Sequence, residues 1–135
     1  GPCVIVDFGT ATTFDCVTKK GEYAGGLIVP GPLLSAESLS LHTAKLPRVN
    51  IAKPARLIGK NTVESIQSGL YFGYVSLVDG IIDRLKSELG SNCKIIATGG
   101  LAGLIAGESK HIKKEQIEPT LTLEGIYRVW ERSIS

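Results

Sequence analysis

The segment from Asp7 to Thr12 follows an apolar run and contains the residue types that bind phosphate and cations. Gly9 permits a tight turn, so the next backbone amides and the hydroxyls of Thr10 and Thr12 are expected to surround one concave spot that holds an anion. Asp7 would face the same spot. A carboxylate beside a phosphate is repulsive unless a cation lies between them, so Asp7 predicts a metal ion, bound directly or through water. An ordinary hairpin with a capped turn explains the segment equally well when it is taken alone.

The elements around this turn are predicted to form an antiparallel meander of three strands. Cys3 to Val6 is short and β-branched, which favours a buried strand, and residues 12–18 and Tyr23–Val29 follow as the second and third strands. A short helix over residues 33–43 comes next. An irregular segment with two prolines, residues 44–60, then leads to the longest helix.

The longest helix is predicted from Thr62 to about Leu89, where apolar residues recur at helical spacing and Asn61 or Thr62 can cap the start. It would extend roughly 40 Å at ~1.5 Å per residue. Small residues form a neighbouring stripe that permits close approach of another backbone: Gly69, Gly73, Ser76 and Gly80. Either a strand of the same chain or a partner subunit could fill that groove.

After this helix the sequence predicts a compact strand over residues 93–97, which leads into Thr98-Gly99-Gly100 and a short helix over residues 101–106. Paired glycines at a helix start let a ligand approach the backbone amides, although a tight strand-to-helix turn is the simpler interpretation of two glycines. An edge strand around residues 110–114 and a final helix over residues 121–133 complete the predicted order. We find no internal domain boundary and expect one domain over residues 1–135.

Composition excludes several classes of function. The 135 residues carry a formal net charge of +2, with the basic residues dispersed, which gives no support to a nucleic-acid interface. No apolar stretch approaches the roughly 20 residues of a membrane-spanning helix, and no signal peptide is expected. Three cysteines inside apolar runs, and two histidines without a neighbouring metal-type ligand, are assigned to packing or surface roles. A reducing, cytoplasmic setting is expected.

The predicted order resembles the ribonuclease H-like α/β domain of the actin, hexokinase and heat-shock chaperone superfamily, in which two such domains close on a nucleotide. Within that superfamily the chain resembles type III pantothenate kinase. The resemblance covers nearly the whole length and rests on five segments in register: Asp7-Phe8-Gly9-Thr10-Ala11-Thr12-Thr13-Phe14-Asp15, Gly25-Gly26-Leu27-Ile28-Val29-Pro30-Gly31, Thr43-Ala44-Lys45-Leu46-Pro47, Gly59-Lys60-Asn61-Thr62 and Thr98-Gly99-Gly100-Leu101-Ala102.

This resemblance implies ATP-dependent phosphorylation of pantothenate, the first step of coenzyme A biosynthesis, by a homodimer that uses a divalent cation such as Mg²⁺ and a monovalent cation, typically potassium. Asp7 matches the residue that binds the monovalent ion. The positions implied for ATP are Gly9, Thr10, Gly99 and Gly100. Thr62 matches a residue that touches pantothenate at the dimer interface, and Gly26, Ile28 and Thr43 resemble residues of the cleft wall.

The family's general base and first phosphate loop have no match here, because the base lies in a Gly-x-Asp-Arg segment upstream of the hairpin. The pair Asp83-Arg84 lies deep in the long helix and is interpreted as a solvated face. The resemblance thus implies that this chain is the second, C-terminal half of a kinase and has no catalytic base of its own. We expect the chain alone to be inactive, since loss of a general base lowers the rate by ~10²–10⁴. A non-catalytic regulatory or dimerisation module is the alternative. A sugar or acetate kinase domain shares the hairpin but does not explain the segment that ends at Thr62.

Overall fold

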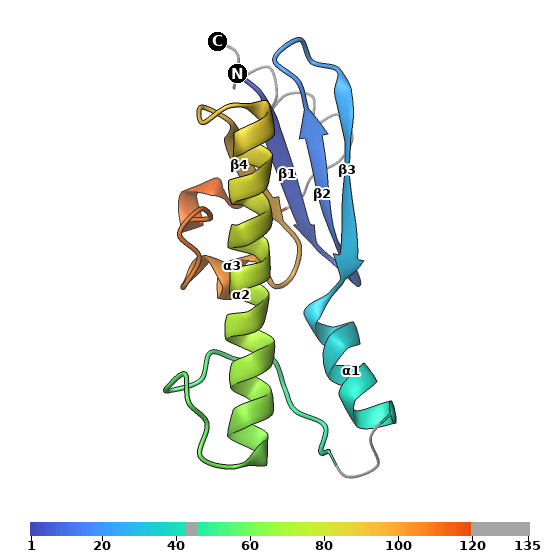
Figure 1. The fold of residues 1–135 in the computed structure, drawn as a ribbon, viewed down its shortest axis with the longest axis vertical. Helices are drawn as coiled ribbons and strands as arrows, with labels where there is room; N and C mark the ends of the chain where they lie inside the picture. Colours follow the sequence, from blue (N-terminus) through green and yellow to red (C-terminus); the bar gives the residue numbers. More distant parts are fainter. Residues whose placement is uncertain (43–45, 120–135) are drawn as a thin grey trace.

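A four-stranded sheet with one long helix packed on it is the centre of the computed structural model, which describes residues 1–42 and 46–119 (Figure 1). The strand order is β3-β2-β1-β4. Strands β1 and β2 pair antiparallel, as do β2 and β3, whereas β4 lies parallel to β1. The strands are β1 (Cys3–Phe8), β2 (Ala11–Val17), β3 (Tyr23–Pro30) and β4 (Lys94–Thr98). The expected mixed α/β class and the three consecutive antiparallel strands are therefore present.

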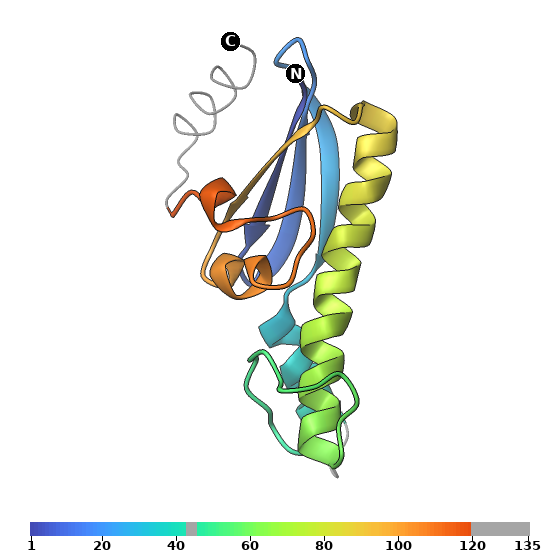
Figure 2. The same ribbon diagram turned by 90° about the vertical axis from the view of Figure 1, so that its left-hand side faces the viewer.

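The helices differ in how they relate to the sheet. They are α1 (Pro32–His42), α2 (Thr62–Leu89), α3 (Ala102–Ala106) and the 3₁₀ helix η1 (Lys114–Gln116). The second half of α2 covers one sheet face, while α1 and the first half of α2 extend beyond the sheet (Figures 1 and 2). Figure 2 shows α3 and the segment after it at the edge formed by β4. No helix in the described ranges is long and apolar enough to cross a membrane.

Helix α2 has the predicted bounds, and its start is fixed by a reciprocal pair of side-chain contacts. The Asn61 side chain accepts a hydrogen bond from the Glu64 amide at 2.8 Å, which makes Asn61, rather than Thr62, the N-cap. The Glu64 carboxylate in turn accepts from the Lys60 amide at 2.7 Å. The hydrogen bond from the Lys60 amide, and to a smaller extent that from the Arg56 guanidinium, lowers the pKa of the Glu64 carboxyl.

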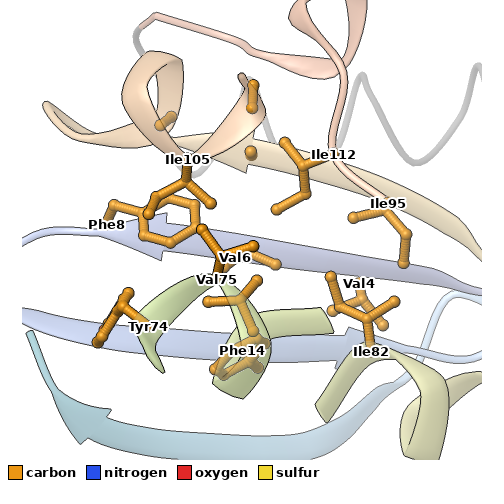
Figure 3. Close-up of a cluster of buried hydrophobic side chains, with 14 of the residues drawn as sticks. Val4, Val6, Phe8, Phe14, Tyr74, Val75, Ile82, Ile95, Ile105 and Ile112 are labelled. Atoms are coloured by element: carbon orange, nitrogen blue, oxygen red, sulfur yellow. The ribbon is translucent and has the colours of Figure 1, made fainter. Parts of the chain in front are cut away.

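The main core lies between the sheet and α2, because alternate residues of a strand point to the same face. Val4, Val6 and Phe8 of β1 join Phe14 of β2 against residues of α2 that recur at helical spacing, such as Tyr74, Val75 and Ile82 (Figure 3). Ile105 and Ile112 close the core on the β4 side. The intervening residues of β1, Cys3 and Ile5, pack with Ile96 on the opposite face.

The prediction of an edge strand around residues 110–114 is wrong. The hydroxyl of Ser109 accepts from the amides of His111 (3.2 Å) and Ile112 (3.0 Å), and Asp79 of α2 accepts from the Lys110 amide at 3.0 Å. Because side chains take these three amide donors, the backbone does not form a strand ladder here. Among the described residues, an isolated parallel bridge joins Ile117 to Ala97. The final helix expected over residues 121–133 lies outside the described residues.

Candidate functional site

The turn between β1 and β2 is exposed and is held in place from the side. Pairing continues to Phe8 and Thr12, so only three residues connect the last strand pair, and both Gly9 and Thr10 are exposed. The amide of Gly31, at the junction between β3 and α1, donates to the Thr10 carbonyl at 3.1 Å. A Cβ atom at Gly31 would lie 2.3 Å from that oxygen, so this close approach requires glycine.

The parallel pairing of β1 with β4 brings the second glycine segment to the same place. Asp7 is paired with Thr98, so Gly99 and Gly100 emerge beside the β1–β2 turn. Gly99 has a φ of 98°, and a Cβ there would lie 2.6 Å from the Phe8 carbonyl oxygen. A cleft of about 380 Å³ results, lined by Phe8, Gly9, Thr10, Leu33, Leu34, Glu37, Gly100 and Leu101. Two segments far apart in the sequence therefore form one wall.

Asp7 lies at the centre of a row of oxygen-bearing side chains on the sheet face away from α2. Its cross-strand partners are Thr13 on β2 and Thr98 on β4, and partners in register share a sheet face. The Asp7 carboxylate is exposed, and an oxygen of it would lie 3.7 Å from a Cβ at Gly9, so it is next to the turn.

The donor set around Asp7 fits a hard cation, because such ions take carboxylate, hydroxyl and carbonyl oxygens. One carboxylate alone suits weak binding completed by other oxygens rather than a closed cage. Residues 1–42 and 46–119 contain no cluster of three or more histidine, cysteine, aspartate or glutamate side chains that could hold a metal ion.

The structure corrects the expectation for Thr12, whose hydroxyl does not face the anion spot. Thr12 is fully buried, and its Oγ1 is hydrogen-bonded to the hydroxyl of Tyr74 on α2. The same Tyr74 hydroxyl lies 3.2 Å from the Pro30 carbonyl oxygen. Burial raises the pKa of Tyr74, an effect that the contact with Thr12 opposes. Of the two threonine hydroxyls expected at the anion spot, only that of Thr10 is exposed.

The predicted pantothenate residues are not brought to this cleft within the chain. Thr62 is the exposed first residue of α2, roughly 18 Å along the helix axis from Tyr74 at ~1.5 Å per residue. Ile28 is 78% exposed on β3 and is paired with Thr13, so it shares the sheet face of Asp7. Gly26 is paired with Asp15, one step further from the turn on that face. Thr43 lies outside the described residues.

Small residues of α2 leave one of its faces open. Gly69, Gly73 and Gly80 are exposed, and a Cβ at any of them would meet no heavy atom within 4 Å outside the local helix. Of the two occupants considered for this groove, a strand of the same chain is not found there among the described residues. Asp83 and Arg84 on the same helix are exposed, as expected, but Asp83 also contacts His111 at 2.6 Å.

Several residues of the site were missed by sequence reasoning. Leu33, Leu34 and Glu37 of α1 line the cleft, although the apolar pattern of that helix gives no sign of a ligand. The sequence pattern places Tyr74 in the apolar stripe of the long helix. The sequence offers one signal for its role: a tyrosine in an apolar stripe is buried, and its hydroxyl then needs a hydrogen-bond partner.

By fold, the chain is a mixed α/β protein whose exposed glycine turns meet at the ends of a parallel strand pair. The chain belongs to the type III pantothenate kinase family, whose model matches residues 1–84. Relatives with that name support the assignment. The protein of Koribacter versatilis is 57% identical over 135 residues, which are 100% of this chain and 48% of the relative.

Two further relatives give the same result. The type III pantothenate kinase of Citrifermentans bemidjiense is 58% identical over 96% of this chain and 50% of its own length. That of Moorella thermoacetica is 50% identical over 98% of this chain and 52% of its own length. The chain thus spans about half the length of the curated relatives it matches.

Among solved structures, a Campylobacter jejuni protein assigned to the Baf family of transcriptional activators shares the fold. Its TM-score is 0.61 at 21% identity, with 96% of this chain and 57% of that chain covered. At this identity the likeness concerns the fold alone.

Proposed function

We propose that the chain is the C-terminal half of an ATP-dependent pantothenate kinase, with a single ribonuclease H-like domain of the actin and hexokinase superfamily. The observation that supports this most is the cleft shared by Gly9, Thr10 and Gly100, because the two segments assigned to ATP come from different parts of the chain and meet at one wall. The proposed reaction rests on membership of the type III pantothenate kinase family, and the proposed ATP position rests on the cleft at the end of the sheet.

In this proposal the exposed turn holds the ATP phosphates, with the Thr10 hydroxyl as a donor, and the Gly99-Gly100 turn borders the adenosine. Phosphoryl transfer depends mainly on positioning and on neutralising charge, so hydroxyls, backbone amides and cations suffice on this side of a cleft. A divalent ion such as Mg²⁺ neutralises the phosphates. Asp7 holds a potassium ion beside the turn, and this ion keeps the carboxylate from repelling the nucleotide.

Pantothenate is proposed to bind beside the phosphate-binding turn of one subunit and to contact Thr62 of the partner subunit in a homodimer. Thr62 lies roughly 18 Å along the axis of α2 from Tyr74, whose hydroxyl contacts the strand ends at the hairpin, and this separation supports a site in which the Thr62 hydroxyl comes from a second subunit. Ile28 and Gly26 lie outside the cleft at the turn and are proposed to contribute to the pantothenate side of the site, on the sheet face of Asp7. The protein is proposed to act in the cytoplasm, without nucleic acid or membrane partners.

The test is turnover of pantothenate with Mg-ATP in potassium buffer, followed by release of ADP and by mass spectrometry of the product. We expect turnover by a full-length protein that carries this segment and none by residues 1–135 alone, because the general base is contributed by the other half. Turnover by residues 1–135 alone would refute the assignment of the general base to the other half of the protein. An inactive full-length protein that still dimerises would favour the non-catalytic alternative.

A further inference from the structure

Tyr74 contacts the ends of the three antiparallel strands that surround the exposed turn. Its ring lies 6.5 Å from that of Phe8, the last residue of β1, at an interplanar angle of 59°. Its hydroxyl is bonded to Thr12 near the start of β2 and lies 3.2 Å from the carbonyl of Pro30 at the end of β3. Figure 3 shows Tyr74 in the same buried cluster as Phe8 and Phe14, between these strands and α2.

The chemistry of the groups fixes the direction of both hydrogen bonds. A tyrosine hydroxyl has one proton and the Pro30 carbonyl can only accept, so both contacts are satisfied when Tyr74 donates to Pro30 and Thr12 donates to Tyr74. Tyr74 is 7% exposed and Thr12 is fully buried, so water cannot replace either partner without opening the core. Gly31, next to Pro30, is the residue whose amide holds the Thr10 carbonyl.

We propose that Tyr74 is a positioning residue for the phosphate-binding turn, acting through Thr12 on one side of the turn and through the Pro30–Gly31 peptide on the other. This inference rests on the proposed function. The turn itself is exposed, so its shape depends on its two anchored ends. A shift of about 1 Å in a group that positions a substrate can lower the rate about 100-fold, which makes these anchors important for catalysis.

The decisive variant is Tyr74→Phe in the full-length protein, which keeps the ring and removes the hydroxyl. We expect the KM for ATP, and the Kd for a non-hydrolysable ATP analogue with Mg²⁺, to rise about threefold to tenfold, the range for one neutral hydrogen bond. The KM for pantothenate should stay within about twofold. Amide hydrogen exchange at Gly31, whose amide donates to the Thr10 carbonyl at 3.1 Å, should become faster, a readout that needs no nucleotide.

Tyr71→Phe is the matched control. Tyr71 lies one turn earlier on α2, is fully buried, and donates to the Leu104 carbonyl of α3 at 3.0 Å. Tyr71→Phe should lose as much thermal stability as Tyr74→Phe, while its KM and Kd for ATP and its amide exchange at Gly31 stay unchanged. Thr12→Val should reproduce the defect of Tyr74→Phe, and Thr12→Ser, which keeps the hydroxyl, should retain ATP affinity.

Equal loss of ATP affinity in Tyr71→Phe and Tyr74→Phe would overturn the inference, because a general loss of stability would then explain both. Unchanged ATP affinity together with unchanged exchange in Tyr74→Phe would also overturn it. If the wild-type protein is inactive but Tyr74→Phe still accelerates amide exchange at Gly31, the proposed function is refuted and the positioning role of Tyr74 stands.

Discussion

The backbone of Gly99 lies against the carbonyl of Phe8, so closely that a Cβ atom at Gly99 would fall 2.6 Å from the Phe8 oxygen. This contact joins the turn that follows β4 to the last residue of β1. It explains why the two glycine segments share a cleft, because neither can move away from the other without breaking the β1–β4 ladder.

Gly99→Ala should destabilise the domain by at least about 2 kcal/mol, since alanine meets both the Phe8 backbone and an unfavourable positive φ. Gly100→Ala is the control, because a Cβ there meets no atom within 4 Å. Urea unfolding of both variants checks the difference. Equal stability of the two would show that the β1–β4 end can relax.

Asp7→Ala in the full-length protein should weaken activation by potassium, raising the potassium concentration for half-activation at least about tenfold, as expected for loss of a charged ligand. Asp7→Asn, which is nearly isosteric, separates the effect of charge from that of shape. Initial rates across a potassium series provide the measurement. An unchanged potassium response in both variants would place the ion elsewhere.

Thr62→Val keeps the volume of the side chain and removes its hydroxyl. In the full-length protein it should raise the KM for pantothenate by the equivalent of roughly 0.5–1.5 kcal/mol and leave that for ATP nearly unchanged. Asn61, which caps the helix, is untouched, so α2 should start at the same residue. Loss of ATP affinity with pantothenate affinity intact would mean that the two pockets are assigned in reverse.

Gly73→Leu should separate the subunits of the proposed homodimer without unfolding the domain. Gly73 is exposed with open space around its missing Cβ, and leucine is a better helix former than glycine by roughly 0.5–1 kcal/mol. Light scattering tests whether the subunits separate, and thermal unfolding tests whether the domain stays folded. Gly73→Ala, which adds a smaller side chain, is the control. A Gly73→Leu protein that remains a dimer would exclude this face as the interface.

Asp83 should contribute to stability in a pH-dependent way. The hydrogen bond from His111, and then that from Lys110, lowers the pKa of its carboxyl. A carboxyl with a lowered pKa stabilises the folded state above its unfolded pKa of about 3.9, and this contribution is lost as the pH falls through the folded value. Asp83→Asn should therefore lower the Tm at about pH 7, and the difference from wild type should shrink between about pH 5 and pH 3.

Glu88→Gln, which alters an exposed carboxyl of the same helix, is the control for Asp83→Asn. Both variants change the net charge equally, so a general charge effect would act on both. A difference between wild type and Asp83→Asn that stays constant over this pH range would show that the contact with His111 does not depend on the ionised carboxylate.

The sequence by itself determined the local elements and the family. The β-branched runs, the short turns and the helical spacing from Thr62 to Leu89 are local patterns, so they predicted three antiparallel strands and the long helix with small errors at the ends. The glycine segments at positions 9 and 99 were recognised as candidate ligand turns for the same reason, because the backbone freedom of glycine is a local property.

Only the tertiary structure decided which side chains face the cleft. Thr10 and Thr12 are two residues apart and chemically identical, yet one is exposed and the other is buried against Tyr74, because the register of β2 and the position of α2 settle which face each residue takes. In the same way, the segment after Ser109 is not a strand because Asp79, far away in the sequence, accepts a hydrogen bond from the Lys110 amide. Such contacts join distant parts of the chain, and no local pattern encodes them.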